Sequence, residues 1–354
     1  RVSGSEIISS NSKTSYNGNY GLNASWTLYN GNKRLKTIQQ EKLNNQVAEL
    51  DVATSENNIQ ESIAQVYIQI LYAAESVKVN ESTLQVSIAQ RDRGQELLNA
   101  GSIAKSDFAQ LEAQVSTDRY QLVTAQATLE DYKLQLKQLL ELDGENEMNI
   151  YLPALSDENV LAPLPTKKDV YIRALSLRPE IEASKLNVEA SELGIGIAKS
   201  SYLPTISLSA GIGTNHTSGS DFTFGEQVKN GWNNSIGLSV SVPIFNNRQT
   251  KSAVQKAKLQ YETSMLSLLD EQKTLYKTIE GLWLDANSAQ QRYAAANEKL
   301  KSTQISYELI SEQFNLGMKN TIELLTEKNN LLQAQQEQLQ AKYMAILNMQ
   351  LLKF

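Results

Sequence analysis

The side chains that most often carry chemistry are scarce in this chain. It has no cysteine, which excludes disulfides and thiolate metal sites, and its single histidine, His216, cannot build a metal cluster. Two Gly-x-Gly pairs, beginning at Gly194 and Gly211, lack the third glycine of a dinucleotide-binding loop. The sequence therefore predicts a protein that is not an enzyme and that has no cofactor and no bound metal.

The remaining candidates are charged side chains that follow two glycines, Gly101 and Gly317. Asp107 follows the first glycine, and Lys319 and Glu323 follow the second. In a helix the four-residue spacing of Lys319 and Glu323 gives an ordinary ion pair of small energy. The net charge of −6, without a basic patch, argues against nucleic acid as a partner.

An internal repeat places these residues in equivalent positions. A constant, gapless offset of 216 aligns Tyr67 with Trp283, Gly101 with Gly317, Asp107 with Glu323 and Leu136 with Leu352. We predict a first repeat at 1–140, an equatorial linker at 141–167 and a second repeat at 168–354. The helix that opens the second repeat has no counterpart in the first, so an N-terminal helix is expected to be missing there.

Strands are predicted where apolar and polar residues alternate. Three such runs lie at 20–29, 205–213 and 235–245, and a less regular fourth lies at Val2–Ser10. The residues expected on the lipid-facing side are Leu22, Trp26, Leu28, Ile206, Leu208, Leu238, Val240 and Val242. Strands of this length suit a tilted bilayer crossing, but four are too few to close a barrel. Several copies of the chain must then contribute their strands to one shared barrel.

After the strands the hydrophobic period becomes helical. Residues 33–98 and 249–315 predict two long coiled-coil helices of about 100 Å, since each residue adds about 1.5 Å. Shorter returning helices are expected at 104–140 and 320–352, and one more at 168–200. Two alternatives remain open at this point: a soluble β-sandwich with a helical stalk, and a soluble coiled-coil scaffold.

Four segments stand in a distinctive order and spacing. They are Trp26-Thr27-Leu28-Tyr29-Asn30-Gly31-Asn32-Lys33, Leu177-Arg178-Pro179-Glu180-Ile181, Ala198-Lys199-Ser200-Ser201-Tyr202-Leu203-Pro204, and Phe314-Asn315-Leu316-Gly317 followed by Thr321-Ile322-Glu323-Leu324-Leu325. In these segments the sequence resembles the TolC family of outer-membrane efflux proteins, and the resemblance covers essentially the whole chain.

The resemblance implies a fold of mixed α and transmembrane β type. Each protomer of a homotrimer would give four strands to a shared twelve-stranded barrel, above a long α-helical coiled-coil tunnel. The implied function is the outer-membrane duct of a tripartite efflux pump or a type I secretion system. Its implied partners are outer-membrane lipid, a periplasmic adaptor (membrane fusion) protein and an inner-membrane transporter of RND, ABC or MFS type. The implied location is the bacterial outer membrane, extending into the periplasm.

The resemblance also implies two sets of functional residues. The periplasmic gate would comprise Ser106, Asp107, Phe314, Lys319 and Glu323. The adaptor would dock on Ala100, Gly101, Ser102, Leu316, Gly317 and Met318. The chain departs from the family pattern at three positions, because relatives can have tyrosine at Phe314, arginine at Lys319 and aspartate at Thr326. A latch made here would lack the phenolic hydroxyl and the planar guanidinium.

Overall fold

The computed structural model describes residues 15–142, 150–151, 153 and 160–353. The chain divides into two compact units, Arg1–Val47 with Ser184–Leu268 and Ala48–Ala183 with Leu269–Phe354. No helix in the described ranges combines the length and the apolar character needed to cross a membrane. The strand predicted at Val2–Ser10 lies outside the described residues.

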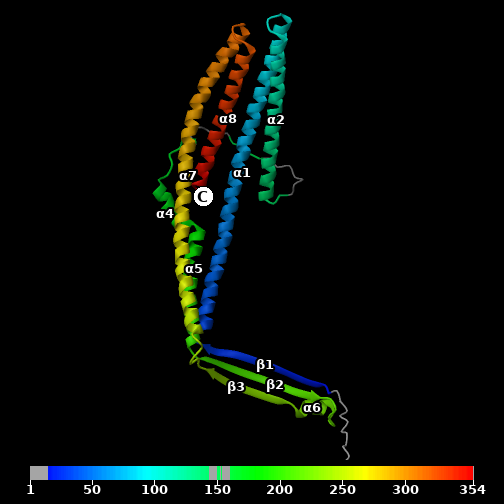
Figure 1. Cartoon of the computed structure of the whole chain (residues 1–354), viewed down its shortest axis with the longest axis vertical. Helices are drawn as coiled ribbons and strands as arrows, with labels where there is room; N and C mark the ends of the chain where they lie inside the picture. The colour runs from blue at the N-terminus through cyan, green and yellow to red at the C-terminus, as the bar shows by residue number, and fades with distance from the viewer. Residues whose placement is uncertain (1–14, 143–149, 152, 154–159, 354) are drawn as a thin grey trace, which may run out of the picture. The chain divides into compact units, whose positions relative to one another are not determined.

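The first unit contains a three-stranded antiparallel sheet in the order β1–β2–β3 (Figure 1). The strands are β1 (Asn17–Asn30), β2 (Thr205–Thr217) and β3 (Asn233–Ser241). The register forms apolar rows such as Trp26–Leu208–Leu238 and polar rows such as Thr27–Ser207–Ser239. Since successive side chains point to opposite faces, the sheet has one apolar and one polar face, as the alternation predicted.

Two of the predicted lipid-facing residues are placed differently by the structure. The register shifts between Thr27 and Tyr29, so Leu28 is the extra residue of a β-bulge and Tyr29 pairs with Ile206 in the apolar row. Val242 lies one residue beyond the end of β3. It precedes Pro243, which has no amide hydrogen to donate to a neighbouring strand.

The linker between β2 and β3 contains a short helix that the sequence analysis missed. Helix α6 (Phe224–Asn230) begins with a capping box, in which Thr223 and Glu226 bond each other's backbone amides. The Thr214 hydroxyl of β2 donates to the Val228 carbonyl at 2.9 Å. The linker is therefore tied to the end of the sheet.

Four helices form two antiparallel hairpins (Figure 1). The first hairpin is α1 (Lys33–Asn99) with α2 (Lys105–Leu139), and the second is α7 (Gln249–Asn315) with α8 (Thr321–Leu351). Helices α1 and α7 have 67 residues each, and their bounds differ by 216 positions, as 249 − 33 and 315 − 99 both show. The residues preceding them, Asn32 and Arg248, share the same left-handed φ of 63°.

The helix predicted at 168–200 is interrupted. It consists of α4 (Lys167–Leu177) and α5 (Pro179–Lys199), followed by the short 3₁₀ helix η1 (Ser200–Tyr202). Arg178 between them is extended, with ψ of 120°. The cause is Pro179, because the proline ring disfavours the helical conformation of the residue before it.

The apolar core of the second unit joins the two hairpins. Ile68 and Leu71 of α1 form one buried cluster with Leu339 and Tyr343 of α8, and the Tyr293 side chain of α7 is fully buried in it. A smaller cluster packs Ile181, at the start of α5, against Leu275 and Ile279 of α7, with α4 residues at its edge. The predicted returning helices are confirmed, and the packing of one hairpin against the other is a finding of the structure.

Candidate functional site at the helical hairpin turns

The first hairpin reverses direction at Gly101. The Ser102 amide donates to the Leu97 carbonyl at 2.8 Å, and the Gly101 amide donates to the Leu98 carbonyl at 3.0 Å. This pair of bonds closes a helix end in the Schellman motif, which needs a left-handed residue, and Gly101 has φ of 71°. Ala100, Gly101 and Ser102 are exposed at this turn.

The second hairpin repeats that turn at Gly317, whose φ is 72°. The Met318 amide donates to the Gln313 carbonyl at 2.8 Å, and the Gly317 amide donates to the Phe314 carbonyl at 2.9 Å. At both turn glycines, no heavy atom beyond the glycine and its two chain neighbours lies within 4 Å of the point where a Cβ would stand. Leu316 and Met318 are each 70% exposed, so the turn presents apolar side chains to its surroundings.

The two carboxylates predicted near the gate occupy the third position of α2 and of α8. One oxygen of Asp107 accepts the Ala104 amide at 3.3 Å, and one oxygen of Glu323 accepts the Asn320 amide at 3.1 Å. Only α8 has the reciprocal bond, in which Asn320 accepts the Glu323 amide at 2.9 Å. Both carboxylates are therefore anchored to the start of their own helix.

Glu323 also forms an ion pair with Lys319, with 2.6 Å between Nζ and Oε1. The Lys319 ammonium, and after it the Asn320 amide, hold the pKa of the Glu323 carboxyl below its usual range. Glu323 is therefore ionised at neutral pH. The pair is partly exposed and has the four-residue spacing of an ordinary helix pair, as the sequence allowed.

The other two predicted gate residues lie in contrasting environments. Ser106 is exposed on the first turn of α2. Phe314 is only 4% exposed, and Thr321 and Leu324 close to it in sequence are also buried. Phe314 is thus buried at the end of α7, whereas Ser106 is exposed.

The structure brings the predicted gate residues together only in part. Lys319 and Glu323 meet, but in the described part of the chain no hydrogen bond joins either of them to Ser106 or Asp107. The polar contacts of each turn stay within its own hairpin. No group of acidic and histidine side chains among the described residues could hold a metal ion.

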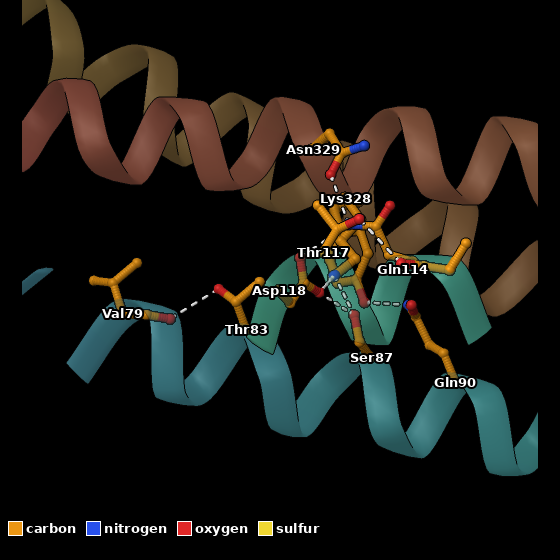
Figure 2. Close-up of polar contacts among 11 residues, drawn as sticks. Val79, Thr83, Ser87, Gln90, Gln114, Thr117, Asp118, Lys328 and Asn329 are labelled. Carbon is orange, nitrogen blue, oxygen red and sulfur yellow. Dashed lines mark hydrogen bonds and ion pairs between the residues drawn. The ribbon is translucent and has the colours of Figure 1, made fainter. Parts of the chain in front are cut away.

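A buried polar cluster that sequence reasoning missed connects the two hairpins (Figure 2). Lys328 of α8 donates to Asp118 of α2 and to Ser87 of α1, and the Ser87 hydroxyl donates to the same Asp118 carboxylate. The Lys328 and Asp118 side chains are only 4% and 2% exposed. Burial lowers the pKa of Lys328, and the charge of Asp118 opposes that shift.

Hydrogen bonds donated by uncharged side chains flank this cluster. Gln114 of α2 donates to Asp118 at 2.9 Å and to Asn329 of α8 at 3.3 Å, and Figure 2 shows both residues beside the ion pair. Gln90 of α1 donates to the Tyr307 hydroxyl of α7 at 2.8 Å. Each helix of the first hairpin is therefore bonded to a helix of the second.

The sequence contained a signal for this cluster. On α2 the buried residues Leu111, Val115 and Asp118 have the four-then-three spacing of a helix core face. On α8 Leu324, Lys328 and Leu331 repeat that spacing. An acid on one core face and a base on another are uncommon unless they are paired. The spacing places each charged residue on a core face, but the pairing of Lys328 with Asp118 depends on how the hairpins pack.

The chain matches a family model described as outer membrane efflux protein over residues 1–141 and 170–352. It is 24% identical over 290 residues to the outer membrane efflux protein BepC of Brucella suis biovar 1, covering 81% of this chain and 60% of BepC. It is 23% identical over 311 residues to the outer membrane protein TolC of Escherichia coli K12, covering 85% of this chain and 62% of TolC. The chain therefore spans about three fifths of the length of these relatives.

Solved structures share the fold. CusC, a protein that forms a transmembrane channel, superposes with a TM-score of 0.80 at 20% identity, over 98% of this chain and 79% of CusC. The CmeC outer membrane channel of Campylobacter jejuni superposes with a TM-score of 0.76 at 18% identity, over 95% of this chain and 75% of CmeC. These superpositions confirm the predicted TolC-like architecture of strands and long helical hairpins.

Proposed function

Because the chain belongs to the outer membrane efflux protein family, we propose that it is one protomer of an outer-membrane channel that exports substrates to the exterior. The sheet carries the main support for this proposal. Its apolar rows are exposed along β3, where Ile236, Leu238 and Val240 are 84%, 66% and 59% exposed. An apolar face of this extent calls for a lipid or protein environment, and a polar face behind it can line water.

Assembly follows from the edges of the sheet. Among the described strands, β3 pairs with β2 alone, so its outer edge carries unpaired backbone groups. Each such group costs several kcal/mol in lipid, which favours pairing with the strands of other copies. We propose a homotrimer that closes its sheet in this way, each protomer being organised as two repeats (1–140 and 168–354) around the linker 141–167.

The two hairpin turns are proposed as the surface of the channel that binds its partner protein. Exposed Leu316 and Met318, with Gly317 between them and Ala100, Gly101 and Ser102 on the other turn, would bind a periplasmic adaptor, since methionine suits adaptable contacts. That adaptor would connect the channel to an inner-membrane transporter of RND, ABC or MFS type. The proposed location is the outer membrane, with the helical hairpins in the periplasm.

The gate is proposed at the same turns, from Ser106, Asp107, Phe314, Lys319 and Glu323. Three copies would gather three Glu323 carboxylates at the tunnel end, with three from Asp107 nearby. Glu323 is ionised at neutral pH, so three copies would bring three negative charges to the tunnel end. The soluble scaffold that the sequence left open is not supported by membership in an outer-membrane family.

The full-length protein is expected to be an obligate trimer, because the strands of one protomer cannot seal a bilayer. Native mass measurement in mild detergent should give three chains, and the purified trimer should form conducting pores in a planar bilayer. A detergent-solubilised protein that stays monomeric, or a trimer without conductance, would contradict the proposed function.

Neutralising the carboxylates in the double variant Glu323→Gln, Asp107→Asn is expected to reduce cation selectivity. A ring of carboxylates in a narrow mouth focuses negative potential and favours cations. Reversal potentials across a salt gradient measure the change, and trimer yield should stay at the wild-type level. As a matched control, Glu327→Gln removes a carboxylate one helical turn further along α8. An unchanged reversal potential in the double variant would place the ring elsewhere.

A further inference from the structure

Helix α6 is held against one end of the sheet by aromatic rings (Figure 1). Its first residue, Phe224, packs edge-on against two rings of the sheet, with ring centroids 6.3 Å from Tyr20 and 5.0 Å from His216. The hydrogen bond from the Thr214 hydroxyl to the Val228 carbonyl adds a second point of contact. The helix therefore has a fixed place relative to the strands.

These contacts all lie on the apolar side of the sheet. Leu22 and Ile212 stand opposite each other in one of its apolar rows, and Tyr20 and Thr214 stand opposite each other two residues further along. His216 follows two residues after Thr214 in β2. Since side chains two residues apart in a strand share a face, Tyr20, Thr214 and His216 all point to the apolar side. Helix α6 therefore lies over the end of the apolar face.

Several aromatic side chains around α6 remain exposed. We call them the aromatic patch, and each of its members is between 53% and 73% exposed: Tyr16, Tyr20, Phe222, Phe224 and Trp232. Tyr16 directly precedes β1, and Trp232 directly precedes β3. Both are in phase, along the sequence, with the apolar residues of the strand that follows. The patch therefore continues the apolar face beyond the last apolar rows.

The polar face is different at the same end of the sheet. Its side chains there are amides, with Asn19 opposite Asn215 and Asn233 opposite Gly213. Within β1, β2 and β3 as described, no aromatic residue lies on the polar face. Rings that narrow a water-filled pore would have to project from that face. A patch confined to the apolar face is instead typical of the boundary between lipid and water.

The length of the apolar face agrees with a bilayer. Tyr20 and Tyr29 lie at its two ends, and their partners in β2, Thr214 and Ile206, are eight residues apart (214 − 206). Eight residues span about 27 Å, at about 3.4 Å per residue. A strand tilted by about 40° then rises about 21 Å, close to the apolar band of about 25 Å that aromatic residues flank in membrane-spanning sheets. This places α6 at the edge of the band.

We propose that α6 and the aromatic patch bind the headgroup layer of a lipid membrane. The helix would lie in the membrane surface, and neither in bulk water nor across the pore. Tyrosine and tryptophan suit this layer because one part of the ring meets acyl chains and the polar part meets water, and phenylalanine adds apolar area to an interfacial helix. The inference rests on the proposed function, since it requires that the apolar face of the sheet meets lipid.

Fluorescence quenching in the full-length trimer tests the proposal. An environment-sensitive dye is attached to Phe222→Cys, as the only free thiol of the protein, and the trimer is reconstituted into phosphatidylcholine vesicles. The lipid carries a nitroxide quencher either on the headgroup or deep in the acyl chain, and iodide is the quencher in water. We expect the headgroup nitroxide to quench this dye most strongly. The matched control is Asn19→Cys, on the polar face at the same end, where only iodide should quench the dye.

The possible results separate the inference from the proposed function. If iodide quenches the Phe222→Cys dye most strongly, α6 lies in water or over the pore, and the inference is overturned. Protection from all three quenchers would place α6 under protein and would also overturn it. Ile236→Cys, 84% exposed on the apolar face of β3, should be quenched by the acyl-chain nitroxide. If neither lipid nitroxide quenches the Ile236→Cys dye, the sheet does not meet lipid, and the proposed function fails together with the inference.

A further substitution tests whether Phe224 holds the helix in place. Phe224→Ser removes the ring contacts with Tyr20 and His216 and keeps the capping box of Thr223 and Glu226. In this background we expect headgroup quenching of the Phe222→Cys dye to fall and iodide quenching to rise. The Ile236→Cys dye should be quenched as before. Equal quenching at Phe222→Cys with and without Phe224→Ser would overturn the role assigned to Phe224.

Discussion

Replacing Lys328 with methionine is expected to destabilise the protein by about 3–5 kcal/mol, because it leaves the Asp118 carboxylate buried without its cation. Asp118 would keep its bonds from Ser87 and Gln114, but neither of these donors carries a charge. Chemical denaturation followed by the helical circular dichroism signal measures the loss. The reverse variant, Asp118→Leu, should be similarly damaging because it strands the ammonium of Lys328.

The double variant Lys328→Met, Asp118→Leu is expected to regain most of that stability. Replacing a buried ion pair with apolar side chains of similar volume is often neutral or stabilising. The difference between the double variant and the sum of the two single variants gives the coupling energy. Lys319→Met is the matched control, because its partly exposed pair with Glu323 contributes little. Additive single effects would show that Lys328 and Asp118 do not interact.

Replacing Leu238 with arginine is expected to impair membrane assembly by about 2–4 kcal/mol at the bilayer midplane, where a charge on the lipid face is most costly. Leu238 stands opposite Leu208 in an apolar row of the sheet. Denaturant titration of the trimer in phospholipid vesicles measures the cost. The yield of assembled trimer, which should be lower for Leu238→Arg than for the wild type, is a second measure of this cost.

The neighbouring variant Ser239→Arg is the control for position and for charge. Ser239 stands opposite Ser207 on the polar face, where an arginine would meet water in the proposed channel. Its assembly should be close to that of the wild type. If Leu238→Arg and Ser239→Arg are equally harmful, the assignment of the two faces to lipid and water is wrong.

Most of the helical architecture could be predicted from periodicity alone. The long runs starting at Lys33 and Gln249 are predicted within one residue of their observed bounds, because a helical hydrophobic period and a lack of proline leave few alternatives. The helix stops at Gly101 and Gly317 were equally clear, since glycine after a helix favours the left-handed turn. The long helices and their ends can be predicted because they depend on residues that are close together in the sequence.

Three features of the structure are not predicted by the sequence pattern: the break between α4 and α5, the short helix α6 and the bulge in β1. The helical period runs through Pro179 without a break, yet the restriction that proline places on Arg178 divides the predicted helix into two. The capping box formed by Thr223 and Glu226 gives only a weak signal, because a polar linker surrounds it. The bulge at Leu28 could not be seen in one strand, because a bulge is defined by its partner strand.

The candidate site was predicted less completely than the fold. Lys319 and Glu323 pair as their spacing allows, because that contact lies within one helix turn. The contact of Lys328 with Asp118 joins residues 210 positions apart, so it depends on how the hairpins pack. The offset between repeats could not reveal it either, since the equivalent positions are Glu112 and Ala334 and carry no such pair.

The two Schellman turns also have a stereochemical consequence. Gly101 and Gly317 have open space around the missing Cβ, yet their φ values of 71° and 72° disfavour an L side chain. The requirement at these turns is therefore one of handedness and not of size. A D-alanine introduced by chemical synthesis would suit both positions, whereas L-alanine would be strained there. Mirror-image residues could thus stiffen the hairpin ends without altering any neighbouring contact.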